Sequence, residues 1–435
     1  MSKYDLVIVG GGTAGCATAY MAGKLKLKTL LIEKSGVLGG SMTSGLVMPA
    51  MKSSENQINT DFMDALIKEM KKIGGQVDYM GNSGWFNPEL LKIALDNLMS
   101  ETNVKVLHNT TVLSIQHSCD RIISLSLYNE LLSPCTYSID NLGFNDLSVS
   151  IDTKYLVDAT GNAEIFKNLN CEFLQNNEEE TQPFSLRFIM SGIDLEAYSQ
   201  WLLDIDKNED VTTVQHIDGV LHLSTACTWD KTRKWALLPI FKAGVANGLL
   251  KPDDINYFQT FTVPGMPNSL AFNCPRLVNC EGTLDIENIS KALQEGRSTI
   301  FRLSEFFKKY FPGFKKSYIS NISDMLGIRA SRRIKGKYIY KMDDIINGTE
   351  FDKPVAISNY PIDVHSSDKD GSTLKKVGDY QIPLEALMSK QYDNLFAVGR
   401  CISADFMAQG AIRVQPTCFS MGVGLAKYLA KLCRH

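Results

Sequence analysis

The sequence predicts an α/β fold in which a second α/β domain is inserted into a domain built on a parallel sheet. Three observations predict it. An apolar run near the N-terminus leads into a glycine-rich turn, and a second apolar run follows after a helical stretch. The 435 residues exceed one typical hydrophobic core, so two domains are expected. The pattern of short apolar runs changes character between residues 175 and 330.

The N-terminal segment reads as a strand, a tight turn and a helix. The run DLVIV leads into Gly10-x-Gly12-x-x-Gly15, and a second apolar run ends at Glu33. Gly10 permits the tight turn, Gly12 lets backbone N–H groups approach a pyrophosphate, and Gly15 lets the helix pack closely on the strand. Glu33 would accept hydrogen bonds from ribose hydroxyls. This unit predicts a Rossmann-like, three-layer dinucleotide-binding domain, and by itself it fits NAD and FAD equally.

The next part of the chain continues this domain. A second glycine-rich loop spans residues 36–45, and helical periodicity covers residues 59–73 and 88–100. A three-stranded meander with a polar insertion at 129–146 is predicted from three runs: Val104–Gln116, Arg121–Tyr128 and Leu147–Thr153.

Residues 175–330 are predicted to form the inserted cap domain. A long helix is expected at roughly 285–310, because Pro312-Gly313 would end it. Residues 1–174 and 331–435 are then the two parts of the first domain. The strands expected in the cap are Phe184–Met190, Val220–Leu223, Ala236–Phe241 and Ser269–Phe272. The C-terminal part is expected to hold a strand and turn, Asn394–Arg400, and a helix, Thr417–Leu432.

Composition and charge exclude several classes of protein. The chain is 44% hydrophobic and 21% charged with a net charge of −3, so nothing indicates a nucleic-acid partner. The N-terminus passes directly into the first strand and no apolar run could cross a bilayer, so we expect a cytoplasmic protein without a membrane partner. The ten cysteines form no Cys-x-x-Cys pair, and neither a structural disulfide nor a metal site is expected.

Three further segments resemble flavoproteins of the glutathione reductase structural class. Leu156-Val-Asp-Ala-Thr-Gly161 resembles the strand end that passes the adenosine half of FAD, and Leu395–Arg400 resembles the C-terminal strand whose turn reaches the ribityl and pyrophosphate region. Gly410–Thr417 resembles the segment that places a helix N-terminus against the isoalloxazine ring, where the helix dipole stabilises negative charge. The order and spacing of the three segments imply FAD.

The C-terminal half resembles one family in more detail, the FAD-dependent oxidoreductases, a broad relative of the succinate dehydrogenase and fumarate reductase flavoproteins. The resemblance is carried by Pro312-Gly-Phe, Leu326–Gly336, Tyr360–His365, Ile382–Leu387 and Asn394–Ala404. Together with the glycine motif it implies contacts to FAD from Gly10, Gly12, Ala14, Gly15, Glu33, Lys34, Gly40, Ser41, Thr43, Val112, Ala159, Thr160, Gly161, Gly399, Arg400, Arg413 and Thr417.

Two positions depart from the common flavoprotein pattern. Arg400 stands where many flavoproteins carry Asp, so the contact made there is open. Glu164 lies where an Asp-Gly-like continuation is common, and no role is assigned to it.

Motifs that the chain lacks limit the redox reactions that can be expected of it. A second GxGxxG unit is missing, so a built-in NAD(P)H domain is not expected, and the electron donor or acceptor stays unknown. Without Cys-x-x-Cys the chain is no disulfide reductase of the familiar kind. The loop after Gly40 holds Ser41 and Thr43 but no His, so we expect non-covalent FAD.

Two arginines and a histidine are the candidate catalytic residues. Arg329 lies in Leu-Gly-Ile-Arg, His365 follows Pro-Ile-Asp-Val, and Arg413 comes just before the helix expected to face the ring. We expect Arg329 and Arg413 to bind a small molecule that bears a carboxylate or carbonyl group, and His365 to act as acid or base. The alternatives are a surface or interdomain salt bridge for each arginine, and a packed or solvated imidazole for His365.

Four other residues are weaker candidates for the site. Cys401 lies beside the predicted flavin-proximal turn, but without a resolving Cys or evident base it is expected to be a small packed side chain. Trp229 and Trp235 could line a substrate pocket or belong to the cap core. Arg276, in Cys-Pro-Arg, could point into the interdomain cleft.

The predicted activity is two-electron hydride transfer between a small metabolite and flavin N5. A flavin-dependent monooxygenase that uses O₂ and an external reductant is the alternative, and a non-catalytic flavin-binding protein is a third interpretation. An exposed sheet edge or cap surface would also allow a homo-oligomer.

Overall fold

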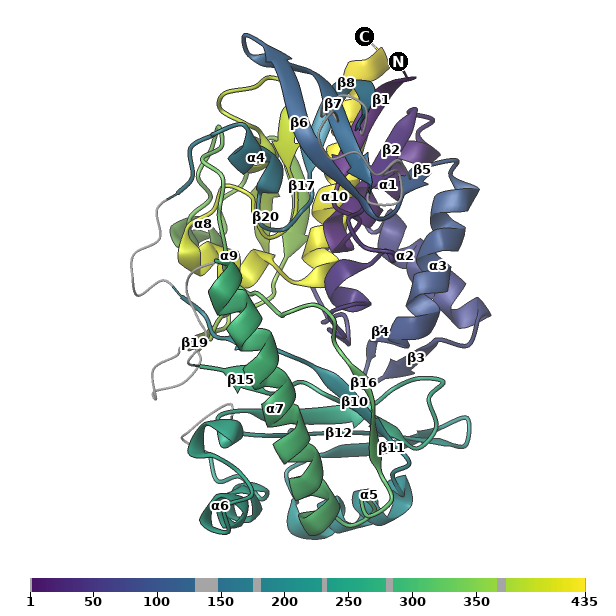
Figure 1. The fold of residues 1–435 in the computed structure, drawn as a ribbon, viewed down its shortest axis with the longest axis vertical. Coiled ribbons are helices and arrows are strands. Elements are labelled where there is room, and N and C mark those ends of the chain that lie inside the picture. The colour runs from purple at the N-terminus through teal and green to yellow at the C-terminus, as the bar shows by residue number, and fades with distance from the viewer. Residues whose placement is uncertain are drawn as a thin grey trace, which may run out of the picture.

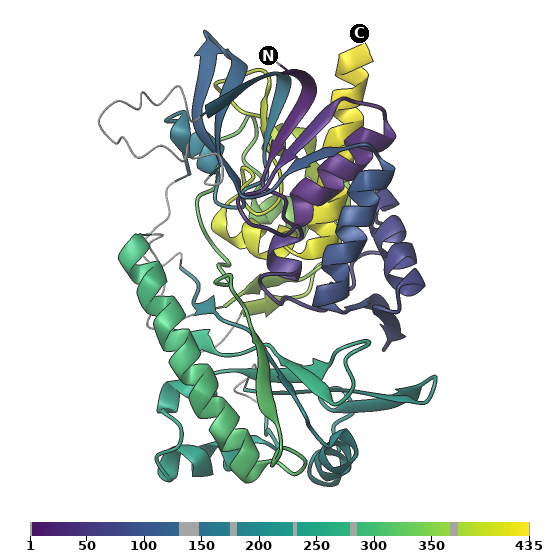
Figure 2. The ribbon, with the colours of Figure 1, turned by 45° about the vertical axis from the view of Figure 1, so that its right-hand side comes forward.

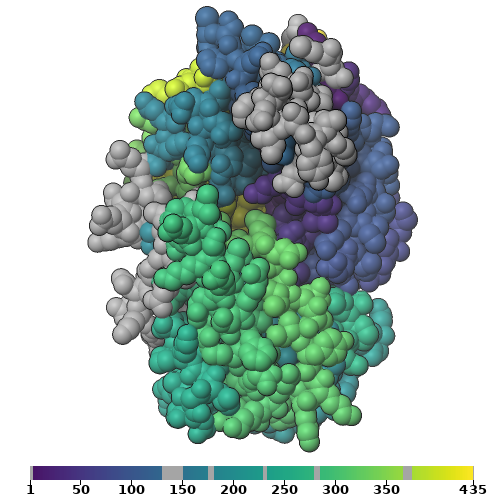
Figure 3. All heavy atoms as spheres, in the orientation of Figure 1, coloured from purple at the N-terminus to yellow at the C-terminus, as the bar shows by residue number. Residues whose placement is uncertain are grey.

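The computed structural model describes residues 2–129, 148–174, 181–228, 233–278, 285–365 and 373–434. They form an upper part, which holds both ends of the chain, and a lower part made of the middle of the chain (Figures 1 and 2). The surface is hollowed where the two parts meet (Figure 3). Most of the predicted polar insertion at 129–146 lies outside the described residues, and so does Trp229.

The upper part is built on a seven-stranded sheet with a parallel core. β1 (Ser2–Val9) lies between β2 (Thr29–Ile32) and β8 (Ser148–Asp158), and all three strands run parallel. β5 (Lys105–Leu107) extends the sheet beside β2, and β21 (Leu395–Ala397) pairs in parallel with β8. This arrangement confirms the predicted Rossmann-like fold.

The meander differs from the prediction at both ends. The single strand expected at Val104–Gln116 is wrong, because the chain turns at Asn109 with a φ of 50°. Its first part is β5 in the parallel sheet, and its second part is β6 (Thr110–Ser118), which pairs with β7 (Arg121–Asn129). The strand expected to end at Thr153 continues to Asp158, so β8 pairs with β7 through its first half and with β1 and β21 farther along.

Helices cover the parallel sheet. α1 (Thr13–Lys24), α2 (Asp61–Lys72), α3 (Pro88–Glu101) and α10 (Gln415–Arg434) confirm the predicted helices, and Pro88 occupies the first helical position of α3. α1 and α10 pack closely, since a Cβ at Gly422 would lie 2.6 Å from the carbonyl oxygen of Ala14.

Several short elements of the upper part were not predicted, because each is too short for a clear periodicity. They are η1 (Gly40–Met42), β3 (Gln76–Tyr79), β4 (Asn82–Phe86), α4 (Glu164–Asn168), α8 (Met342–Asn347), β17 (Pro354–Ser358), β18 (Ile362–Val364), β19 (Thr373–Lys375), β20 (Tyr380–Pro383), η5 (Leu384–Leu387) and α9 (Phe406–Ile412).

The lower part is built on a six-stranded antiparallel sheet. Its order is β11 (Thr213–Ile217), β12 (Val220–Cys227), β13 (Phe258–Thr262), β14 (Ser269–Phe272), β10 (Phe188–Ser191) and β16 (Tyr318–Ile322). The helices of this part are α5 (Leu195–Ile205), α6 (Leu238–Ala246), η4 (Pro252–Ile255) and α7 (Ile286–Tyr310), and the bounds of α7 confirm the predicted long helix.

The two faces of this sheet belong to different cores. Phe188 and Met190 lie in the aromatic core shared with α5, α6 and α7, whereas Ile189 between them packs into the core of the upper part. Phe261 and Ala271 also face the upper part. The period-2 alternation of the strands therefore joins the lower part to the upper part.

Two strand predictions in the cap fail. The strand expected at Ala236–Phe241 is wrong, because Pro239 occupies the first turn of helix α6. The strand expected at Phe184–Met190 is interrupted, since β9 (Phe184–Ser185) turns aside to pair with β15 (Arg276–Leu277) before β10 begins. The limits predicted for the cap, 175 and 330, stay predictions.

Candidate functional site

The glycine turn after β1 leaves open space at the N-terminus of α1. Gly10 has a φ of 106°, and a Cβ there would lie 2.5 Å from the carbonyl oxygen of Ala159. A Cβ at Gly15 would lie 1.8 Å from the carbonyl oxygen of Gly10, so both positions require glycine. At Gly12 a Cβ would meet no atom within 4 Å, and no side chain caps the helix that starts there. The first N–H groups of α1 therefore face space that a phosphate group fits.

Glu33 is fixed at the edge of this space. Its carboxylate accepts hydrogen bonds from the backbone N–H groups of Gly11 (2.7 Å) and Ser35 (2.8 Å), and the residue is 8% exposed. Each carboxylate oxygen has a further lone pair, which suits it to accept a ribose hydroxyl. Lys34, the next residue, is exposed.

The second glycine-rich loop lies against the first. The N–H of Gly39 donates to the carbonyl oxygen of Gly11 at 2.8 Å. Gly40 follows with a φ of 52°, and the hydroxyl of Ser41 lies 3.3 Å from that of Thr13 at the start of α1. Thr43 is fully buried and donates to the carbonyl oxygen of Leu38. Ser41 is thus placed beside the open space, while the hydroxyl of Thr43 serves the loop itself.

The turn after β8 is organised by Asp158, a residue for which no role was predicted. Its fully buried carboxylate accepts hydrogen bonds from Thr160 N (3.0 Å), Thr160 Oγ1 (2.7 Å) and Ile165 N (2.9 Å). Burial raises the pKa of Asp158 despite these donors. The turn holds Ala159 against Gly10, and Gly161 adopts a φ of 75°.

Arg400 binds protein groups on two other segments. Its Nε donates to the carbonyl oxygen of Gly161 at 3.0 Å, and its two terminal nitrogens donate to Ile328 O and Asn162 Oδ1. Burial lowers the pKa of Arg400 to about 10. The guanidinium therefore joins the C-terminal turn to the turn after β8. Gly399 beside it lies against α1, since a Cβ at Gly399 would be 3.1 Å from the Cβ of Ala14.

The start of α10 lies beside the loop that follows η1. Gln415 Nε2 donates to the carbonyl oxygen of Val47 at 2.7 Å. The Thr417 hydroxyl is buried and donates to Ser358 Oγ at 3.0 Å, so it fixes the helix to β17. Val112, on β6, is partly buried.

The structure brings the three predicted catalytic residues together where the two parts of the chain meet. Arg413 Nη2 donates to the backbone oxygen of Asp363 at 3.0 Å and lies 3.7 Å from its carboxylate. His365 Nε2 lies 3.4 Å from the same carboxylate. Arg329 is 9% exposed and donates to the carbonyl oxygen of Pro183 at 2.7 Å. Pro183 follows Gln182, whose Oε1 accepts the N–H of His365 at 3.2 Å.

Arg329 is buried, so it does not form the surface salt bridge that was one of its two alternative roles; the interdomain salt bridge stays a prediction. Its neighbour Arg332 does, since Arg332 Nη1 lies 3.1 Å from Glu164 Oε1 and both side chains are partly exposed. This pair also gives Glu164 a structural partner.

The lower part, which corresponds to the predicted cap, contributes three further residues to this cluster. Arg187 and Tyr257 were not predicted from the sequence, and Arg276 was a weak candidate. The guanidinium of Arg276 stacks over the Tyr257 ring, 3.8 Å from its centroid. Arg187 Nη1 donates to the carbonyl oxygen of Met48 at 3.5 Å. An arginine inside the apolar run 184–190 was the available signal for Arg187, because such runs bury their side chains.

Burial and, after it, mutual repulsion shape the electrostatics of this cluster. Burial lowers the pKa of Arg329 well below its usual range, and the charges of Arg276, Arg413 and Arg187 lower it further. Burial and the same arginines lower the pKa of His365 well below its usual range. The imidazole is therefore neutral at pH 7 and can take up a proton only when negative charge arrives beside it.

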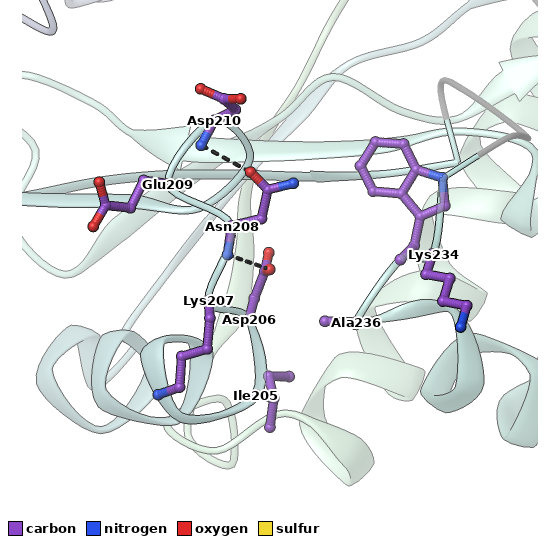
Figure 4. Close-up of a pocket in the computed structure, with 9 residues that line it drawn as sticks. Ile205, Asp206, Lys207, Asn208, Glu209, Asp210, Lys234 and Ala236 are labelled. Atoms are coloured by element: carbon purple, nitrogen blue, oxygen red, sulfur yellow. Dashed lines mark hydrogen bonds between the residues drawn. The ribbon is translucent and has the colours of Figure 1, made fainter.

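Two other candidates belong to hydrophobic cores. Cys401 is fully buried, and burial raises the pKa of its thiol, so it is a packed side chain as expected. Trp235 is 6% exposed within the cap core and lines a pocket of about 770 Å³ between residues 205–210 and 234–236. Figure 4 shows the charged side chains around that pocket, including Asp206, Lys207 and Asp210.

Two kinds of feature are absent from the described residues. No group of three or more His, Cys, Asp or Glu residues could hold a metal ion there. Within the same part of the chain, no helix combines the length and the hydrophobicity that crossing a bilayer requires.

Comparison with known proteins assigns the family. Residues 5–434 match the family described as FAD dependent oxidoreductase, so the chain belongs to it. The open space at Gly12, the carboxylate of Glu33 and the turns at Ala159 and Gly399 fit FAD.

Curated relatives match only in part. The chain is 37% identical over 66 residues to digeranylgeranylglycerophospholipid reductase of Methanococcus vannielii, which covers 15% of this chain and 17% of that protein. It is 30% identical over 76 residues to thioredoxin reductase of Listeria monocytogenes, covering 18% and 24%. It thus spans less than a quarter of the length of either relative.

A solved structure also resembles the whole chain. A geranylgeranyl bacteriochlorophyll reductase-like protein from Thermoplasma acidophilum matches with a TM-score of 0.49 and 14% identity, over 100% of this chain and 79% of that one.

Proposed function

We propose that this FAD-dependent oxidoreductase carries out a two-electron reaction on a small anionic metabolite held between the cap and the FAD-binding part. The cluster formed by buried Arg329 and partly buried Arg187, Arg276 and Arg413 is the observation that carries the proposal. Guanidinium groups removed from water cost free energy unless anions compensate them, and so a cluster of them indicates an anionic ligand. When bound, FAD supplies hydride transfer at flavin N5.

The chain's own residues would bind and orient the substrate. Arg329 and Arg413 can each donate two parallel hydrogen bonds to a carboxylate or to a carbonyl oxygen that gains negative charge. Asp363 holds Arg413 in place through its backbone oxygen, at 3.0 Å. In a site shielded from water these hydrogen bonds are stronger than in solution.

His365 would move the proton. Its imidazole is neutral, since burial and the arginines lower its pKa, so it can accept a proton from a substrate carbon or oxygen. Asp363, 3.4 Å from its Nε2, would stabilise the imidazolium that forms.

The test compares Arg329→Lys with Arg332→Lys, a matched change on the same segment. Pyruvate, which has both a carboxylate and a ketone, is titrated into the FAD-loaded protein and the flavin spectrum is followed. Arg329→Lys should weaken binding by about 30-fold or more and leave the flavin content intact, because Lys cannot form the two-point contact. Arg332→Lys should bind as the unmodified protein does. Equal binding by both variants would overturn the proposal.

The electron partner needs a separate experiment. Anaerobic addition of NADH and NADPH should bleach the flavin bands if a diffusible nicotinamide delivers hydride. A flavin that stays oxidised would indicate that the substrate or a protein partner delivers the electrons. The relation to succinate dehydrogenase and fumarate reductase flavoproteins and the homo-oligomer stay predictions.

A further inference from the structure

Three arginines of the cluster, Arg187, Arg276 and Arg329, lie on backbone segments that are hydrogen-bonded to one another. Ser185 pairs with Arg276 across β9 and β15. On its other side Ser185 exchanges two hydrogen bonds with Gly327, of 3.1 and 2.8 Å. Arg187 is two residues from Ser185, and Arg329 is two residues from Gly327. The pairing of β9 thus fixes these three guanidinium groups close together.

The cluster has two sides. Arg413 reaches it from the FAD-binding part, where Asp363 anchors it at 3.0 Å, and His365 lies 3.4 Å from the carboxylate of the same Asp363. Arg329 lies between the two sides, because the charges of Arg276, Arg413 and Arg187 all act on it. Arg187 and Arg276 reach it from the cap. Stacking on Tyr257 sets the plane of the Arg276 guanidinium.

Tyr257 is itself held in place. Its hydroxyl donates to Gln259 Oε1 at 2.9 Å and accepts from Asn273 Nδ2 at 3.2 Å, and Asn273 Nδ2 also donates to Gln259 Oε1 at 2.9 Å. The cap side of the cluster is therefore a preorganised surface for a ligand.

Around Arg329, the described residues supply more positive than negative charge. Those whose charges act on it most are Arg276, Arg413, Arg187 and Asp363. In the part of the chain that the structure describes, buried Arg187 Nε, Arg413 Nε and Gln182 Nε2 donate no hydrogen bond. Buried donors without an acceptor are rare in proteins, and oxygen atoms of a bound ligand would accept these hydrogen bonds. Arg187 belongs to the cap and Arg413 to the FAD-binding part, so a ligand with acceptor oxygens at both of its ends would reach the donors on both sides.

We infer that the substrate carries two anionic groups, one bound by Arg329 and Arg413 and the other by Arg187 and Arg276 of the cap. This inference rests on the proposed function. The second group is a carboxylate or a phosphate, since both present the planar or clustered oxygens that a guanidinium binds at two points. Arg187 and Arg276 then determine which substrates bind, because they contact the end of the substrate that lies away from the reacting bond.

The experiment compares ligands with one and with two anionic groups on the FAD-loaded protein. Pyruvate, succinate and 2-phosphoglycolate are titrated while the flavin spectrum is followed. We expect succinate or 2-phosphoglycolate to bind at least about 30-fold tighter than pyruvate, as one further charge-assisted contact provides. The stronger of the two identifies the second group as carboxylate or phosphate.

Substitutions test whether Arg187 and Arg276 cause the preference for a doubly charged ligand. Arg187→Met and Arg276→Lys should each lower the affinity for the doubly charged ligand to about that for pyruvate. Arg297→Met, at an exposed position of α7, is the matched control and should keep the full preference. Flavin content checks the fold of each variant. The thermal midpoint of Arg187→Met without ligand should not fall, because the change relieves repulsion among like charges.

The possible outcomes distinguish the proposed function from the inference of a second anionic group. If pyruvate binding depends on Arg329 and the doubly charged ligands bind no tighter, the proposed function stands and this inference is overturned. If none of the three ligands binds, both are overturned. A preference for two anionic groups that persists in Arg187→Met and Arg276→Lys would overturn the assignment to the cap.

Discussion

Arg400 Nε donates a hydrogen bond of 3.0 Å to the carbonyl oxygen of Gly161, a residue 239 positions earlier in the chain. The bond joins the turn after β21 to the turn after β8, and both turns border the predicted FAD site. Because the same guanidinium also reaches Ile328 O, one side chain ties both turns to the segment that leads to Arg329.

Replacing Arg400 by Lys should lower the free energy of unfolding by about 2 kcal/mol, because Lys keeps the charge but cannot reach three acceptors at once. Denaturant unfolding of the FAD-loaded protein measures it. Arg121→Lys, at an exposed position of β7, is the control. An Arg400→Lys protein as stable as this control would show that the three bonds do not stabilise the fold.

Two glycine substitutions should separate cofactor binding from folding. Gly12→Ala places a Cβ where no protein atom lies within 4 Å, so the protein should fold normally and lose at least about 10-fold in FAD affinity. Gly15→Ala places a Cβ 1.8 Å from a backbone oxygen and should impair folding itself. Unfolding and flavin retention after gel filtration are measured for both. Full flavin retention by Gly12→Ala would contradict the assigned phosphate position.

His365 should make stability depend on pH. Its folded pKa is lowered well below the unfolded value of about 6.5, so the unfolded state binds more protons as pH falls from 7 to 5. Stability should therefore fall over this range, by up to about 1.4 kcal/mol per pH unit from this residue. His365→Asn should flatten the profile, and His117→Asn, at an exposed position, should not. Parallel profiles for all three proteins would refute the lowered pKa.

Asp254 and Arg302 should contribute strongly to the stability of the cap. Arg302 Nε and Nη2 donate to the two carboxylate oxygens of Asp254 at 2.9 and 2.8 Å, and the Asp254 side chain is 3% exposed. Asp254→Ala should cost about 3 kcal/mol, because it leaves the partly buried guanidinium without its main partner. Glu305→Ala breaks the exposed pair with Lys308 and should cost less than about 0.5 kcal/mol. Equal costs would show that burial does not strengthen the first pair.

The sequence predicted those features whose signals are local. The glycine motif, the strand before it and helix α7 could all be read from spacing and periodicity, because each depends on residues within one element. The strand expected at Ala236–Phe241 failed since an apolar run of six residues fits a strand or a helix, and Pro239 decided for the helix.

The candidate site could be predicted only in part. Arg329, His365 and Arg413 were found because each lies in a segment that resembles a known family. Arg187 was missed, and Arg276 was only a weak candidate, because their relation depends on the pairing of β9 with β15, a contact across 91 residues of sequence that neither segment reveals alone. The role of Asp158 was missed because two of its four hydrogen-bond donors come from α4, a helix too short to predict.

The parallel sheet has a consequence for how the protein is made. β21 and α10 follow the cap in the chain, yet β21 pairs with β8 and α10 packs on α1. During synthesis, β1, α1 and β8 are therefore made before their partners. The edge of β8 that pairs with β21 and the face of α1 that packs on α10 stay uncovered while the ribosome adds the whole cap. Until residues 395–434 emerge, the nascent chain exposes apolar surface that chaperones recognise, so early release or truncation before β21 should yield aggregates rather than a smaller flavoprotein.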